Sequence, residues 1–404
     1  MICRRYSCWR EGDKIVEKQE FSGKRIVRVM AVVAALLCCG VSRNENRLSA
    51  LEKERIRFAQ QCFAAAGTER LISPFGLNLN LAVLACGSAG NTRREFCQLL
   101  PCRPGGSPLV EIREVIRQIG PSNCTFSYRN ELWYDASITR LKKDFLNEIQ
   151  AGHGCEVRSA DFSDADADSS WLVFELISTL RFEDRWQTPF EPDNVEELFY
   201  RTPGQPGEKC SMMVRNQAML AGYEDADWQS VWLPFQNGGM AMLLLKPRTV
   251  VPVRELGTRL TAETIIRHVE NRQYGFYLLR MPKFQMQNSL DCRNIVQRMG
   301  CKLDSGADFS NLYEPLNWTN ILSVRPMRTE HMEIARMIQN NEFEIDEIRA
   351  RGQSETTTWG VGFGCAAVET MPMVVESFTA DRPFVFILFH MPTKSVLFIG
   401  SYAG

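Results

Sequence analysis

The sequence predicts an α+β fold, in which strands and helices are interspersed along one large domain. Two observations favour strands: residues 343–348 alternate between apolar and polar side chains, and residues 383–402 hold two apolar runs bounded by Pro and Gly. A third observation favours helices, because residues 48–66 place apolar side chains on one stripe that ends at Gly67. Strands punctuated by Pro and Gly among scattered helices are typical of α+β architecture.

The composition excludes several classes of function. The chain has 404 residues, of which 45% are hydrophobic and 24% charged, so it can bury a sizeable core. A formal net charge of −1 gives no global case for nucleic acid or an anionic membrane as a partner. The four histidines have no metal-like spacing, and no Gly-x-Ser-x-Gly elbow occurs. We therefore expect no enzyme activity, no metal site and no cofactor.

The N-terminus is typical of an export signal. Two arginines precede an apolar run at residues 29–41, and this run is shorter than the ~18 apolar residues of a membrane span. We expect residues 1–42 to be a leader, with Met30 as an alternative start, and residues 43–404 to be a secreted, extracellular domain. A membrane anchor is the competing interpretation of the run.

The cysteines and two Asn triplets fit an exported chain. Four of the fourteen cysteines lie in the leader, and the rest show no Cys-x-x-Cys pair, so no disulfide pairing is assigned. Many of them lie in apolar patterns, where a free Cys is a small core residue. Asn123-Cys-Thr and Asn317-Trp-Thr are acceptor triplets for glycosylation at Asn123 and Asn317.

The segments after the first helix continue the mixed pattern. Residues 71–92 predict a short strand, a helix that starts at Pro74, and a Gly-rich stop. Residues 130–135 predict a strand that leads into a helix from Leu141, and residues 171–177 predict another strand.

Several motifs, in this order along the chain, resemble those of the serpin family. The resemblance covers nearly the whole chain from about Leu48 and rests on Leu71-Ile-Ser-Pro, Gly87-Ser-Ala-Gly-Asn-Thr, Trp186-Gln-Thr-Pro-Phe, Leu233-Pro-Phe, Met281-Pro-Lys-Phe, Gly306-Ala-Asp-Phe-Ser, Phe378-Thr-Ala-Asp-Arg-Pro-Phe and Leu397-Phe-Ile-Gly-Ser. It implies the serpin fold, with several helices around a large mixed main sheet and smaller sheets. It also implies an exposed reactive-centre loop at about residues 348–377.

The chain departs from the family pattern after Asp161. The family continues there with a helix that lies across the front of its main sheet. In this chain an acidic turn, Asp164-Ala-Asp-Ala-Asp, leads almost directly to the strand at 171–177. Roughly two dozen residues are missing, enough for a helix of several turns. Either the deletion is real or the gene model has lost an exon.

The segment 350–366 alternates between small side chains at even positions and bulkier ones at most odd positions. Successive side chains of a strand point to opposite faces, so one face of this segment is slim enough to enter a packed sheet. An exposed Gly/Thr-rich loop is the alternative.

By resemblance, Glu347 begins the hinge of the reactive-centre loop. In the preferred register the inward residues are Ala350, Gly352, Ser354 and Thr356. A second register takes Gly352 as the hinge glycine. It would point Glu355 and Trp359 into the sheet, and burying an unpaired carboxylate costs several kcal/mol.

The reactive bond has two candidate positions. Counting forward from Glu347 by the usual loop length reaches Phe363, followed by Gly364. Counting back from Phe378 reaches Thr370 and Met371 instead, and this second position is preferred because spacing from the exposed end sets where the bond is displayed.

Four positions correspond to those that let the family's main sheet open. Ser73 is retained, but Gly76 stands where a second Ser is usual, Ser178 with its following Thr replaces Asn-Ala, and Gln339 replaces His. We therefore expect an altered hydrogen-bond network beneath the opening strands.

The resemblance implies a function in which the loop is bait for a serine protease. After acylation the cut loop inserts as a new strand, and the covalently held protease is distorted. The expected partner is a chymotrypsin- or elastase-like protease, bound by a monomer, with no nucleic acid and no membrane once the leader is removed. The alternative is a serpin-fold binding protein or carrier, or a decayed copy, that no longer inhibits.

Overall fold

The computed structural model of the chain describes residues 46–67, 71–119, 126–136, 140–160, 174–237, 239–303, 306–314, 337–352 and 375–404. Contacts divide the chain after Arg47, and the compact unit from Leu48 onward is described here. Its helices are α2 (Ala50–Ala66), α3 (Pro74–Gly87), α4 (Gly90–Leu99), α5 (Pro108–Ile119), α6 (Lys143–His153), α7 (Val253–Arg259), α8 (Ala262–Glu270) and α9 (Cys292–Arg298).

The strands in the described part of the chain form two sheets. They are β1 (Phe126–Tyr134), β2 (Glu156–Ser159), β3 (Phe174–Arg185), β4 (Val195–Phe199), β5 (Glu208–Glu224), β6 (Trp228–Pro234), β7 (Met240–Pro247), β8 (Gln273–Pro282), β9 (Phe284–Asp291), β10 (Ile338–Ile345), β11 (Arg349–Gly352), β12 (Val375–Thr379), β13 (Phe384–His390) and β14 (Ser395–Tyr402). The first sheet has the order β2-β1-β3-β11-β10-β9. The second has the order β12-β8-β5-β6-β7-β13-β14, with β4 paired to β5.

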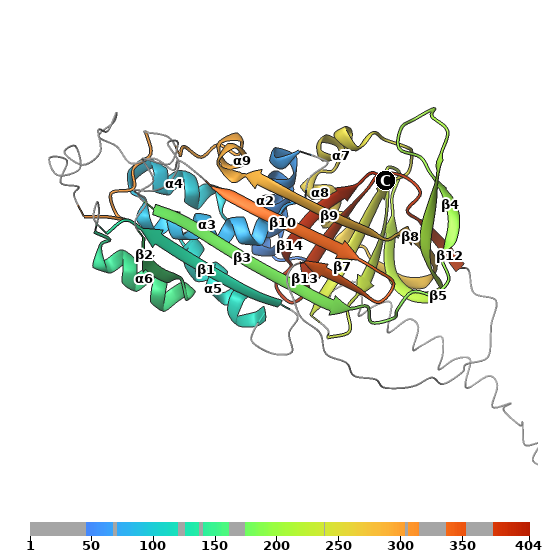
Figure 1. Cartoon of the computed structure of the whole chain (residues 1–404), viewed down its shortest axis with the longest axis horizontal. Helices are drawn as coiled ribbons and strands as arrows, with labels where there is room; N and C mark the ends of the chain where they lie inside the picture. The colour runs from blue at the N-terminus through green and yellow to red at the C-terminus, as the bar shows by residue number, and fades with distance from the viewer. Residues whose placement is uncertain are drawn as a thin grey trace, which may run out of the picture. The chain divides into compact units, whose positions relative to one another are not determined.

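The helix α3 lies behind the six-stranded sheet and is buried along nearly its whole surface (Figure 1). It begins at Pro74, where the missing N–H costs nothing, and Ser73 caps it by accepting a hydrogen bond from the Gly76 N–H at 3.1 Å. A helix that is apolar on all sides must be covered by other elements. The opposite face of the sheet points towards the viewer in Figure 1, and no described helix crosses it.

The two sheets pack on each other through aromatic side chains. Phe343 of β10 stacks on Phe386 of β13 with ring centroids 5.1 Å apart. Phe235, directly after β6, stacks on Trp186 at 4.7 Å and contacts Phe182 edge-on at 5.1 Å. Every residue of β7 and β13 is buried, so these strands form the centre of the core. The sequence therefore places its longest apolar runs where both faces of a sheet are covered.

The predicted α+β serpin fold is confirmed by this arrangement, although several strand predictions were wrong in detail. The short strand expected from residue 71 forms only an isolated bridge between Ile72 and Ile399, and the strand expected at residues 130–135 is β1, which begins at Phe126. The strand expected at residues 343–348 is β10 and ends at Ile345. Asp346 starts a turn instead, because one of its carboxylate oxygens accepts hydrogen bonds from the N–H groups of Ile348 and Arg349, both at 2.8 Å. In the described residues the cysteines are free, and no helix is both long and apolar enough to span a bilayer.

Gly222 of β5 provides a test of the packing between strands. An added Cβ would lie 2.2 Å from the Tyr277 hydroxyl and 2.8 Å from the backbone oxygen of Ser230. We expect Gly222→Ala to lower the melting temperature by roughly 3–8 °C, because backbone has to move. The matched control is Gly275→Ala, where the nearest atom is 3.4 Å away. Equal melting temperatures for the two variants would contradict this packing.

Candidate functional site

The short strand β11 lies between two longer strands of the six-stranded sheet. It pairs antiparallel with residues 182–185 of β3 and with residues 344–345 of β10. In the parts of these two strands that β11 does not reach, residues 174–181 of β3 pair with β1 and residues 338–343 of β10 pair with β9. On the sides that face each other, these stretches pair with no strand of the described residues. Two strand edges with unpaired N–H and C=O groups therefore border one position in the sheet.

The side chains of β11 alternate between the core and the outer face. Ala350 is fully buried and lies directly opposite Asp184. Arg349 and Arg351 are partly exposed on the outer face, where their guanidinium nitrogens lie 2.9 Å and 3.6 Å from the Glu183 carboxylate. This alternation is the one that the register with Ala350 and Gly352 inward requires.

The turn between β10 and β11 is held by hydrogen bonds from residues that follow β3 directly. The indole Nε1 of Trp186 donates to the carbonyl of Asp346 at 2.9 Å, and its backbone N–H donates to the carbonyl of Ile348 at 3.0 Å. The N–H of Phe190 donates to the carbonyl of Glu347 at 2.9 Å. Because Trp186 is itself stacked on the second sheet, the turn is anchored to the core.

The side chain of Glu347 adds a polar link. Its carboxylate accepts a hydrogen bond from Asn194 Nδ2 at 3.1 Å and lies 3.4 Å from Lys283 Nζ. The hydrogen bond from Asn194, with a smaller effect of Lys283, lowers the pKa of Glu347. Its stabilising effect is thus present above the ordinary carboxyl pKa and is lost only as pH falls through the lowered value.

The strand β12 fixes the chain on the far side of residues 353–374. It pairs in parallel with β8, and Phe378 is fully buried. Lys246 Nζ donates to the carbonyl of Thr379 at 2.8 Å and lies 5.2 Å from the centroid of the Phe378 ring. Burial lowers the pKa of Lys246 to about 8. Both ends of the segment are therefore attached to sheets.

Ser73 and Gln339, two of the predicted sheet-opening positions, bind each other. The side-chain amide of Gln339 accepts from the Ser73 N–H at 2.8 Å and donates to the Ser73 carbonyl at 3.0 Å. The Ser73 hydroxyl donates to the carbonyl of Leu397 at 2.7 Å. A Cβ on Gly76 would lie 2.8 Å from Leu180 Cδ1 and 3.2 Å from Gln339 Nε2, so these two side chains occupy the space of a side chain at position 76.

Ser178, the remaining sheet-opening position, lies on the inner face of β3. Its hydroxyl contacts the side-chain amides of Asn80 in α3 and Asn130 in β1. In this arrangement the hydroxyl faces Oδ1 of both amides, so its one proton is shared between two acceptors. The predicted network under the sheet is thus built from amide side chains, and its role in opening stays a prediction.

Sequence reasoning missed Asp184, which lies on the inner face of β3 between Phe182 and Trp186. Its side chain is 2% exposed. One carboxylate oxygen accepts from the Arg185 N–H at 2.7 Å and from Asn237 Nδ2 at 3.0 Å, and the other has no hydrogen-bond partner in the described residues. Burial raises the pKa of Asp184. The signal was an acidic residue at an inward position of an alternating strand.

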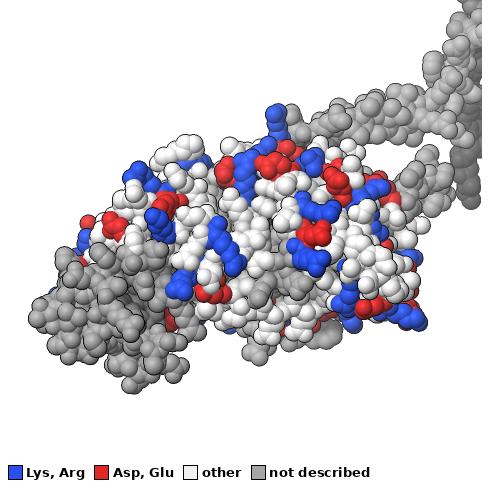
Figure 2. Space-filling model, turned by 90° about the horizontal axis from the view of Figure 1, so that it is seen from above, with Lys and Arg blue, Asp and Glu red and all other residues white. Residues whose placement is uncertain are grey.

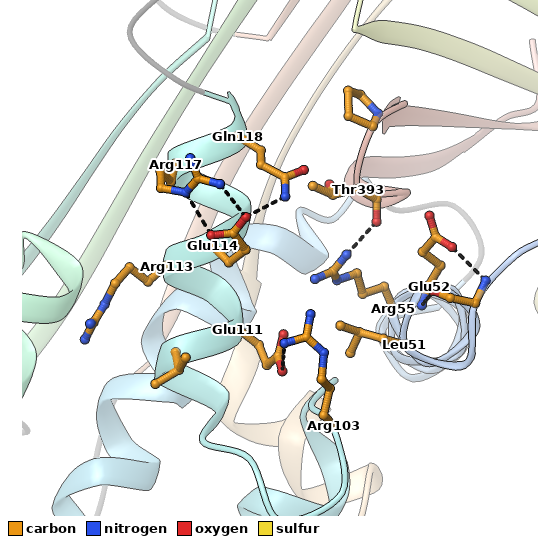
Figure 3. Close-up of a pocket in the computed structure, with 13 residues that line it drawn as sticks. Leu51, Glu52, Arg55, Arg103, Glu111, Arg113, Glu114, Arg117, Gln118 and Thr393 are labelled. Carbon is orange, nitrogen blue, oxygen red and sulfur yellow. Dashed lines mark hydrogen bonds and ion pairs between the residues drawn. The ribbon is translucent and has the colours of Figure 1, made fainter.

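A separate pocket of about 440 Å³ lies between α2, α5 and the turn at Thr393 (Figure 3). Arg103 lies 3.4 Å from Glu111, and Arg117 and Gln118 donate to Glu114. Arg55 donates to the carbonyl of Thr393 at 2.7 Å. The carboxylates and guanidinium groups that line the pocket thus largely bind one another. Figure 2 likewise shows basic and acidic side chains interspersed on the face in view.

Several predicted residues lie outside the described part of the chain. These are the hinge residues Ser354 and Thr356, the reactive-bond candidates Phe363, Gly364, Thr370 and Met371, and the glycosylation sites Asn123 and Asn317. Within the described ranges, no cluster of His, Cys, Asp and Glu has the geometry of a metal site.

Comparison with known proteins identifies the family. The model described as "Serpin (serine protease inhibitor)" matches residues 55–173 and 169–403. The chain belongs to the serpin family. The two matched segments meet at residues 169–173, next to the place where the sequence departs from the family pattern.

Relatives and structures of this family differ in what they do. The chain is 24% identical to "Serine proteinase inhibitor 1" of Myxoma virus over 82% of this chain and 85% of that protein. It is 22% identical to the "Leukocyte elastase inhibitor" of Sus scrofa over 87% and 98%. Human thyroxine-binding globulin, solved with bound thyroxine, matches with a TM-score of 0.68 at 17% identity, over 88% of this serpin and 98% of that chain. At this identity the last match shows the fold alone.

The pair Gln339 and Ser73 can be tested by mutation. We expect Gln339→Leu to destabilise this serpin by about 2 kcal/mol, because the partly buried N–H and C=O groups of Ser73 lose their partner. The measurement is the denaturant midpoint of the uncleaved protein. Asn340→Ala, on the exposed face of the same strand, is the control. If both variants unfold at the same midpoint, the amide does not support the sheet.

Proposed function

We propose that this serpin is a secreted inhibitor of serine proteases that acts by cleavage of the segment after β11 and its insertion into the six-stranded sheet. The observation that carries the proposal is the position of β11. It already occupies the first part of the space between β3 and β10, with Ala350 inward. A strand that continues from Gly352 would follow the same two edges.

The energetics favour insertion once the segment is free to move. Each new backbone pair satisfies groups on β3 and β10 and contributes about 0.5–1.5 kcal/mol net. The inward positions after Gly352 carry Ser354, Thr356 and Thr358, followed by three glycines at 360, 362 and 364. Such small side chains fit against a core that has no spare volume. Continuing the register of β11 therefore demands little repacking of the helix α3 beneath.

The target proposed is a chymotrypsin- or elastase-like protease. Cleavage after Thr370 or Met371, or after Phe363, would present a side chain of suitable size to such an enzyme. One relative is named for inhibition of leukocyte elastase, which supports this class. Secretion is proposed from the leader at residues 1–42, and we propose a monomer that needs no cofactor.

A non-inhibitory carrier or binding protein is the alternative. It is supported by the structural match to thyroxine-binding globulin, which binds a small ligand. The pocket between α2 and α5, at about 440 Å³, has the volume of a small-molecule site. Its lining is charged, however, whereas such sites are mostly apolar. The inhibitor is therefore the better-supported function.

Incubation with proteases separates the two functions. We expect a chymotrypsin- or elastase-like enzyme to yield a complex that survives denaturation, together with some cleaved protein. We also expect a melting temperature higher by tens of degrees after the loop is nicked, because insertion completes the sheet. The control is the same protease inactivated at its nucleophile. Cleavage with neither complex nor thermal gain would exclude insertion.

The inward position of Ala350 gives a sharper test. We expect Ala350→Glu to abolish the covalent complex and leave cleavage intact, because a second buried carboxylate directly opposite Asp184 costs several kcal/mol. The measured quantity is the ratio of complex to cleaved product. The control is Arg351→Ala, which changes the outer face of the same strand and should leave the ratio within about twofold. Equal ratios for the two variants would refute the inward register.

A further inference from the structure

Asp184 lies beside the hinge strand in a position that a charged group rarely occupies. It is directly opposite Ala350 in the pairing of β3 with β11, and both side chains are on the inner face. Directly opposed residues in a sheet have their Cβ atoms about 5 Å apart. The strand β11 therefore covers the side of Asp184 that faces the space between β3 and β10. Withdrawal of β11 would open this side to water.

The carboxylate of Asp184 is only half satisfied in this place. The Arg185 N–H and the Asn237 amide bind the same oxygen, and the second oxygen has no hydrogen-bond partner in the described residues. An ionised carboxylate with a buried, unpaired oxygen costs several kcal/mol. The protonated form avoids most of this cost.

Among the described residues, Asp184 forms no ion pair. The neighbouring charged side chains, Glu183, Arg185, Arg349 and Arg351, lie on the outer face of the sheet. The turn at residues 235–239, which supplies Asn237, contains no charged residue. Phe182 and Trp186, two residues before and two residues after Asp184, are both buried.

We propose that Asp184 is a proton-dependent gate on the hinge, so that protonation of its carboxyl group favours the inserted β11 and ionisation favours its withdrawal. The inference rests on the proposed function, because the hinge is the strand that leads insertion. It adds a regulation of that site by pH.

The direction of the pH dependence follows from linkage. Burial raises the pKa of Asp184 while β11 is in place, and an exposed Asp184 would have an ordinary value near about 4. The inserted hinge is therefore fully favoured when the pH is below the pKa of an exposed Asp184. It loses stability as the pH rises through the raised pKa that Asp184 has with β11 in place.

In the described part of the chain, Glu347 and two buried histidines keep one protonation state across this range. Glu347 has a lowered pKa and so stays ionised above about pH 5. Burial lowers the pKa of His268 and of His390 to about 4, so both stay neutral there.

The test uses the uncleaved full chain and hydrogen exchange of the backbone amides at residues 349–352. Protection factors, corrected for intrinsic exchange, are measured from about pH 5 to about pH 8. We expect protection in the wild type to fall by at least about threefold as pH rises. Asp184→Asn keeps the shape of the side chain and cannot ionise, so its protection should not change with pH. Asp184→Ser is a second neutral variant that serves if the first fails to fold.

Glu183→Gln is the matched control, since it removes a carboxylate from the outer face of the same strand and should keep the pH dependence of the wild type. A flat profile in the wild type, or an unchanged slope in the neutral Asp184 variants, would overturn the proposal. Protease complex formation is measured separately at constant pH. Absence of a complex, with the expected exchange profiles, would refute inhibition and leave the gate intact.

Discussion

An unfilled position between β3 and β10 is the constraint on which the rest of the six-stranded sheet depends. Backbone N–H and C=O groups on the facing edges of these strands have no partner strand in the described residues, although their other edges are fully paired. A sheet with such an interior gap must be held by contacts from its inner face. The apolar helix α3 and the amide pair of Gln339 with Ser73 provide them.

The hinge is held at the beginning of this gap by two opposed sets of interactions. The ion pairs of Arg349 and Arg351 with Glu183, and the hydrogen bonds from Trp186, favour the paired position. The ion pairs are partly exposed and therefore worth at most about 1 kcal/mol each. The incompletely satisfied carboxylate of Asp184 opposes them from the inner face. With terms of comparable size on both sides, a small change in charge can shift the hinge.

Local patterns in the sequence predicted most of the fold and part of the site. The strands β13 and β14 and the helix α3 were predictable because runs of apolar residues and a Ser-Pro start act within a few residues of the chain. The buried position of Asp184 was not, because it depends on which strand lies opposite. The turn at Asp346 is a local feature that the alternation of residues 343–348 concealed. Alternation indicates which side chains point inward, but only pairing indicates what they meet there. The sequence likewise showed that Gln339 replaces the family's His, but it did not reveal the hydrogen bonds of this side chain with the backbone of Ser73.

The outer face of the six-stranded sheet is exposed, so the separation of β3 from β10 depends on contacts at the inner face. Ile177 of β3 and Ile338 of β10 are 37% and 38% exposed, and no described helix crosses this face in Figure 1. An element packed on the outer face would have to move before β3 and β10 could separate, and moving it would add to the free-energy barrier for their separation. The described residues provide no such cover on the outer face. Separation of β3 from β10 is therefore resisted mainly by contacts on the inner face of the sheet. In the proposed insertion, the rate is therefore set where Ser73, Gln339 and the hinge turn hold the two strands.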